Sequence, residues 1–100
     1  MIIYSVEISV DKKIIQSWLT WMKSQHIPDV MKTNLFTGFE FFQNLNIENT
    51  YTIKYKLENL ENYLTYQKHF ASNLQKDHTG KFKGKFKATR RLLMKMEKID

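Results

Sequence analysis

Cysteine is absent from this chain of 100 residues. The absence excludes a disulfide framework, thiolate ligands for zinc or iron-sulfur clusters, and a cysteine nucleophile. The sequence contains no apolar run long enough to span a bilayer, and its first residues lack the basic start and long apolar stretch of a signal peptide. We therefore expect a cytoplasmic protein with no thiol chemistry and no membrane association.

Proline and glycine are also scarce, with one proline and three glycines, and no stretch reads as a flexible linker. The length and the hydrophobic share of 42% are those of one domain with one core, spanning residues 1–100. A domain this small buries a lower share of its surface than a large one does. A second copy would add shared burial, so we expect a homodimer.

Acidic residues are few relative to basic ones, which leaves a net charge of +6. The imbalance is greatest between Lys76 and Lys98, where nine lysines and arginines stand against only Asp77 and Glu97. Two interpretations of this basic run remain open. It attracts an anionic partner, or it is an ordinary solvated surface that keeps the protein soluble.

Alternation of apolar and polar residues predicts a half-buried strand over residues 2–10. Asp11 is placed to cap a helix, and the apolar residues that follow at helical spacing predict a helix from about Lys12 to about Gln25. Pro28 lacks an amide hydrogen and suits the first turn of a helix. Residues 26–31 are therefore expected to form a break followed by a short second helical turn.

The second half of the chain repeats the strand and helix patterns. Residues 39–45 and 51–57 are expected to pair as an antiparallel hairpin. Asn59 is expected to cap a helix that ends near Gln75, followed by a basic loop and a last strand from about Phe86 to Glu97. The inward face of that helix is predicted to carry Leu60, Tyr63, Leu64, Ala71 and Leu74, and the loop to contain Gly80 and Gly84. The last strand is predicted to place Leu92, Met94 and Met96 on one side and Arg91, Leu93, Lys95 and Glu97 on the other.

The order strand, helix, strand, strand, helix, strand predicts an α+β fold of the ferredoxin-like type. This fold has a four-stranded antiparallel sheet with two helices on one face, so its other face is left uncovered. Ile3 and Leu93 oppose the main apolar rows of the first and last strands. We expect this open face to meet a partner subunit.

Several short blocks make the chain similar to a known family. They are Met1-Ile2-Ile3-Tyr4, Trp18-Leu19-x-Trp21-Met22-Lys23, His26-Ile27-Pro28-Asp29-Val30-Met31, Phe36-Thr37-Gly38, Tyr51-x-Ile53-x-Tyr55 and Glu97-x-Ile99-Asp100. With these blocks the whole chain resembles small bacterial proteins grouped as domain of unknown function 4286.

The resemblance implies a dimeric α+β barrel, in which two ferredoxin-like sheets pack face to face. Relatives elsewhere in that superfamily include cofactor-free monooxygenases, chlorite-dismutase-like haem proteins and muconolactone-isomerase-like enzymes. No activity is established for this branch, and a shared fold does not transfer chemistry.

His26 is the one candidate catalytic residue, because it titrates near neutrality and lies at the expected helix break beside Asp29. A neighbouring carboxylate could hold its tautomer, although both residues could equally serve only to cap and orient the helical turn. Trp18 and Trp21 lie three positions apart on a helix and could flank a flat ligand. Core packing is the competing interpretation of both indoles.

Phe41, Tyr55 and Arg91 complete the predicted ligand-binding set of Trp18, Trp21, His26 and Asp29. The residues expected on the open face are Glu7, Glu40, Lys54 and either Arg91 or Arg90. They could line a cavity between subunits or form ordinary cross-strand ion pairs. His26, His69 and His78 lack the spacing of a metal site, and no phosphate-binding loop is present, so no metal and no cofactor are expected.

Three functions compete on this basis. The first is a homodimeric domain that binds a small organic molecule between sheet and helices, in one version as a cofactor-free enzyme. The second is a nucleic-acid-binding module, which the absence of the RNA-recognition signature disfavours. The third is a structural or regulatory dimer that contacts another protein.

Overall fold

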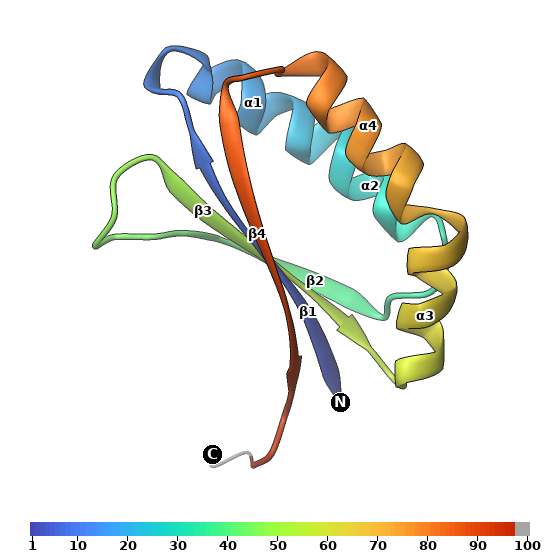
Figure 1. The fold of residues 1–100 in the computed structure, drawn as a ribbon. Coiled ribbons are helices and arrows are strands. Elements are labelled where there is room, and N and C mark those ends of the chain that lie inside the picture. The colour runs from blue at the N-terminus through green and yellow to red at the C-terminus, as the bar shows by residue number, and fades with distance from the viewer. Residues whose placement is uncertain (98–100) are drawn as a thin grey trace.

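The computed structural model describes residues 1–97, and these build one antiparallel sheet of four strands in the order β2-β3-β1-β4. The strands are β1 (Ile2–Val10), β2 (Gly38–Gln43), β3 (Thr50–Leu57) and β4 (Phe86–Met94). All helical segments lie on one side of the sheet, and the other side is bare (Figure 1). The prediction of a ferredoxin-like α+β fold is confirmed.

The alternation of β1 sorts its side chains between the covered and the open face of the sheet. Tyr4 is buried beneath the helices, and its backbone neighbours are Tyr55 of β3 and Leu92 of β4. The covered face of the two central strands holds much of the core: Ile2, Tyr4, Val6, Ile8 and Val10 from β1, and Tyr51, Ile53, Tyr55 and Leu57 from β3.

The first helical stretch runs from Lys12 to Met31. It consists of η1 (Lys12–Ile14), α1 (Ile15–Trp21), a π-helical segment η2 (Met22–His26) and α2 (Ile27–Met31). The predicted break is wrong, because the π-helical segment leads directly into α2, whereas the predicted short second helical turn with Pro28 in its first turn is confirmed as α2. Pro28 cannot donate to the carbonyl four residues before it, and the wider π-helical turn immediately before Pro28 lets the helix continue past the missing bond.

The second helical stretch is longer than predicted and consists of α3 (Leu60–His69) and α4 (Ala71–Lys81). Between them Phe70 leaves helical geometry, with φ −127° and ψ −37°. The predicted end near Gln75 is wrong, because the inward stripe of the helix continues to the buried His78 and Gly80 is helical. Ala71 is buried as predicted, but Leu60 and Leu64, also expected inside, are about half exposed, because the helix turns Tyr66 and His78 inward instead.

The last strand ends at Met94 rather than near Glu97. Met94 lies opposite Ile2, the first residue of β1, so no partner strand remains beyond it. The hydrogen bond from the Lys95 amide to the Met1 carbonyl, 2.9 Å long, closes this end. Lys98 of the basic run and the closing Ile99-Asp100 lie outside the described residues. No helix within residues 1–97 is both long and apolar enough to cross a membrane.

Asn59 caps α3 as predicted, because its side-chain oxygen accepts a 2.8 Å hydrogen bond from the Asn62 amide. Asn59→Ala should lower the free energy of unfolding by about 1 kcal/mol, since an orphan amide at the helix start loses its acceptor. Asn73→Ala, an exposed position within α4, is the matched control and should change stability little. Urea unfolding of both variants measures the difference, and equal stabilities would contradict this role for the cap.

Candidate functional site

A small cavity lies between the covered face of the sheet and the helices. The space that the centre of a water molecule can occupy there is about 20 Å³, enough for roughly one water. Apolar side chains from β1, β3, η2 and α2 form much of its wall. Its polar lining consists of Tyr4, His26, Tyr55, Tyr66, Gln75, His78 and Arg90.

A buried hydrogen bond joins the two helical stretches beside the cavity. The indole N–H of Trp18 donates to Nε2 of His78 over 2.8 Å, and both side chains are almost fully buried. An indole N–H can only donate, so Nε2 must be unprotonated. The neutral His78 ring therefore carries its proton on Nδ1.

Aromatic stacking holds the two cavity imidazoles against the first helical stretch. Trp21 lies nearly parallel to His78 with ring centroids 5.5 Å apart, and His26 stacks on Trp21 at 5.0 Å. The His26 and His78 rings are themselves 5.4 Å apart. Phe86 packs on the His78 ring at 3.9 Å, so that ring has little freedom to turn.

Burial keeps both imidazoles neutral at physiological pH. Desolvation lowers the pKa of His26 from 6.5 to about 4, although Asp29 and Asp77 act in the opposite direction. Desolvation, together with His26 and Arg90, lowers the pKa of His78 to about 3. Such weak bases suit hydrogen bonding at neutral pH better than proton abstraction.

Tyrosines form the other polar side of the cavity. The Tyr4 ring centroid lies 6.1 Å from that of Tyr55 and 5.8 Å from that of Tyr66. Burial raises the pKa of all three phenols. They therefore stay protonated and can donate hydrogen bonds near neutral pH.

Arg90 is the one cationic side chain among the residues that line the cavity. It lies opposite Val6, on the covered face of the edge strand β4. Its positive charge acts to lower the pKa of Tyr4 and Tyr66 as well as that of both imidazoles, in each case as a smaller influence than desolvation. Its field therefore reaches from one side of the cavity to the other.

Four of the seven residues predicted to bind a ligand meet at or beside this cavity. His26 and Tyr55 line the cavity. Trp18 donates a hydrogen bond to His78 and Trp21 stacks on the same ring, so both indoles contact an imidazole that lines the cavity. Trp18 is fully buried, so its surface is used in packing and in the bond to His78.

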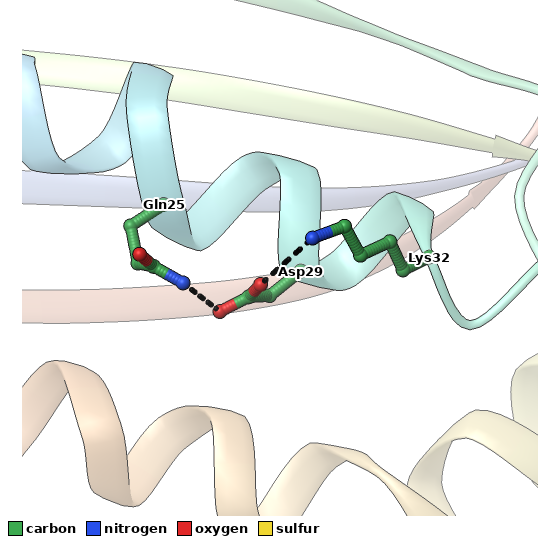
Figure 2. A network of polar contacts seen from close by, with 3 residues as sticks. All are labelled: Gln25, Asp29 and Lys32. Carbon is green, nitrogen blue, oxygen red and sulfur yellow. Dashed lines mark hydrogen bonds and ion pairs between the residues drawn. The ribbon is translucent and has the colours of Figure 1, made fainter.

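The other three lie elsewhere. Phe41 packs on Trp18 with ring centroids 6.0 Å apart and does not line the cavity. Asp29 lies on the helix surface, where its carboxylate accepts a 2.9 Å hydrogen bond from Gln25 and faces Lys32 at 4.0 Å (Figure 2). Arg91 lies on the open face, where its neighbour across the strands is Ser5. Glu7, Glu40 and Lys54 lie on the same face. Arg90, the alternative considered for that face, lies on the opposite one.

The sequence prediction missed His78 and Arg90 as cavity residues. Both had a usable signal. His78 lies four residues beyond Leu74 and seven beyond Ala71, which continues the inward stripe of the helix. Arg90 keeps step with Phe86 and Ala88, the inward-facing residues of β4.

Within residues 1–97 no group of three or more histidine, aspartate or glutamate side chains is arranged to hold a metal ion. The chemistry that this cavity offers is hydrogen-bond donation and positive charge beside apolar side chains.

The buried imidazoles predict acid sensitivity. The folded-state pKa of His78 lies below its unfolded value of 6.5, so the unfolded chain binds the proton first as the pH falls. The resulting stability is complete above about pH 6.5 and is lost as the pH falls toward 3. Between pH 7 and pH 5 this histidine alone should account for a loss of about 2 kcal/mol.

His78→Gln tests this link, since a glutamine oxygen can still accept from Trp18 but does not titrate. In urea unfolding at pH 7 and pH 5, this variant should lose about 2 kcal/mol less than the unaltered protein does. His69→Gln, an exposed position at the end of α3, should lose as much as the unaltered protein. An equal loss in both variants would exclude His78 as the source.

Comparison with known proteins places the chain in a family and a fold. The family model described as Domain of unknown function (DUF4286) matches residues 1–96. No curated protein matches the chain.

Three similar crystal structures share the fold at low sequence identity. A dimeric ferredoxin-like protein from an uncultured marine organism has a TM-score of 0.73 and 10% identity, covering 100% of this chain and 99% of that one. SnoaB, a cofactor-independent oxygenase from Streptomyces nogalater, has a TM-score of 0.72 and 7% identity, covering 98% and 95%. An antibiotic biosynthesis monooxygenase has a TM-score of 0.71 and 8% identity, covering 97% and 100%.

At these identities the similarity shows the fold alone. The match of the family model over residues 1–96 extends across nearly the whole sequence. The chain therefore belongs to the family described as Domain of unknown function (DUF4286).

Proposed function

We propose that this chain forms one ferredoxin-like domain that acts as a homodimer and binds a small organic molecule between its sheet and its helices. The observation that carries the proposal is the cavity in which His26, His78 and Arg90 converge with three tyrosines inside apolar walls. Small-molecule sites are typically apolar hollows with a few placed polar groups, and shifted pKa values cluster at such sites.

The volume of the cavity is sufficient for about one water molecule. A ligand of ordinary size needs several hundred Å³. Binding therefore requires α3 and α4 to move outward from the sheet. The interruption of the helix at Phe70, where the backbone leaves helical geometry, is the natural place for that movement.

Binding fits the cavity better than catalysis does. Both imidazoles have pKa values far below neutrality, so neither is matched to proton abstraction at pH 7. Two structures with this fold are described as oxygenases, one of them cofactor-independent. That similarity supports an organic molecule as the kind of ligand, while His26 stays the candidate for any catalytic role.

The open face of the sheet supports the homodimer. Ile3, Phe42 and Leu93 place apolar side chains on this face, and the latter two are more than 40% exposed. Charges of both signs lie among them, including Glu40 and Arg91, so the face can complement a second copy of itself. A protein with the same fold is described as dimeric.

The open face gives less support to nucleic-acid binding. Stacking on bases needs aromatic side chains on the exposed face of the central strands. In β1 and β3 the aromatic residues, Tyr4, Tyr51 and Tyr55, are buried on the covered face. The open face of these strands carries Ile3, Ser5, Glu7, Ser9, Thr52, Lys54 and Lys56.

A screen of small aromatic molecules tests the binding site, with the indole N–H signals of Trp18 and Trp21 as the readout. We expect at least one compound to shift the Trp18 signal saturably, because its partner His78 lines the cavity. Val30→Leu adds a methylene to the cavity wall and should abolish that shift. Val10→Leu, equally buried in the core but outside the lining, should preserve it. A panel without any saturable shift would contradict the proposed site.

Two adjacent leucines on β4 test the dimer. Leu92 and Leu93 are each 41% exposed and point to opposite faces of the sheet. Leu93→Glu should convert the protein to a monomer, since it buries a charge between the two open faces. Leu92→Glu makes the same change on the covered face and should leave the dimer intact. Sedimentation equilibrium gives the masses, and a monomeric unaltered protein would refute the dimer.

A further inference from the structure

We infer that the ligand of this cavity carries a carboxylate group, which Arg90 and the Nδ1–H of His78 hold. The inference rests on the proposed function and adds the chemical class of the ligand.

The lining of the cavity has donors and positive charge but no acid. Its residues include one arginine, two histidines, three tyrosines and one glutamine, and neither aspartate nor glutamate is among them. The ion pairs recorded within residues 1–97 join Lys32 to Asp29 and Lys56 to Glu40, so neither of them involves Arg90. A guanidinium beside an apolar cavity without a carboxylate is the arrangement that an anionic ligand completes.

His78 contributes a donor whose identity is set by the fold. Its Nε2 accepts from Trp18, so its remaining polar atom is the protonated Nδ1. The rings of Trp21 and Phe86 restrict rotation of the imidazole, which keeps the pattern of one acceptor and one donor in place. A ligand that meets this ring therefore finds a hydrogen-bond donor, which suits an oxygen atom that carries lone pairs.

The tyrosines extend the same preference. Burial raises the pKa of Tyr4, Tyr55 and Tyr66, so each keeps its phenolic proton. Protonated phenols can donate to an anion, and charge-assisted hydrogen bonds are about twice as strong as neutral ones.

Size and charge favour a carboxylate over a larger or more highly charged anion. The space for the centre of a water molecule is about 20 Å³, so a small group needs the least outward movement of α3 and α4. One arginine balances one negative charge, whereas a doubly charged phosphate would leave one charge without a cationic partner in the cavity. Arg90 is exposed and Gln75 half-buried, which places the mouth of the cavity between β4 and α4. The rest of the ligand would leave the cavity there.

Pairs of isosteric probes separate the charge from the shape. Acetate and benzoate are titrated against acetamide and benzamide, and binding is followed by the Trp18 indole N–H signal, assigned with the Trp21→Phe variant. We expect saturable shifts with the carboxylates and at least about tenfold weaker binding of the amides, the ratio that corresponds to one charge-assisted hydrogen bond.

Adjacent arginines on β4 supply a matched pair of variants. Arg90→Gln and Arg91→Gln remove the same charge from neighbouring positions on opposite faces of the sheet. Arg90→Gln should weaken carboxylate binding at least about tenfold, and Arg91→Gln by less than about twofold. Equal effects of the two variants would overturn the inference, because they would reduce it to general attraction by net charge.

The outcomes with these probes distinguish the carboxylate preference from the small-molecule site itself. Amides that bind as tightly as the carboxylates overturn the carboxylate preference and leave the small-molecule site standing. If none of the four probes shifts the Trp18 signal, the carboxylate inference is overturned. If no compound of the wider aromatic panel shifts this signal either, the proposed function is overturned as well.

Discussion

The hydrogen bond between Trp18 and His78 is the contact on which the rest of the site depends. It joins side chains 60 residues apart and ties the first helical stretch to the second above the sheet. Because both groups are buried, leaving either one unpaired would cost about 1–3 kcal/mol. The same bond excludes a proton from Nε2 of His78 and so decides that the ring presents a donor. One hydrogen bond therefore fixes both the packing of the two helical stretches and the protonation of His78 at the cavity.

Irregular points in both helical stretches adjoin this site. The π-helical segment η2 contains Met22 and His26, two residues that line the cavity, immediately before Pro28. The interruption at Phe70 precedes α4, whose inward residues include His78. At Phe70 the backbone leaves helical geometry, yet hydrogen bonds from the Phe70 amide to Tyr66 and from the Leu74 amide to Phe70 still connect α3 and α4. π-Helical turns of the kind seen in η2 are frequent at functional sites.

The two faces of the sheet have different proposed roles. The covered face holds the cavity, whereas the open face offers apolar side chains and charges of both signs to a second copy. Because strand side chains alternate, adjacent residues of β4 serve different faces. Arg90 points toward the cavity and Arg91 toward the proposed partner, although nothing in their chemistry distinguishes them.

Local pattern was enough to predict that four strands form and where they lie along the chain, although the last one ends at Met94 rather than near Glu97. The alternation of β1 and the capping oxygen of Asn59 are short-range features, and both were predicted correctly from the sequence. The prediction failed at a proline and a glycine, two residues that usually interrupt helices. Pro28 reads as a helix break, yet the helix continues because a π-helical turn absorbs the missing bond. Gly80 reads as loop, yet α4 runs through it to Lys81.

The candidate site divides along the same line. The sequence by itself determined which residue types are present in this chain: many aromatic side chains, three histidines and an excess of positive charge. It also placed Trp18, Trp21 and His26 on one helical stretch. Only the tertiary structure decided that His78 and Arg90 join them while Asp29 and Arg91 point elsewhere. Helix rotation and strand register set those directions, and both depend on packing between segments far apart in the chain.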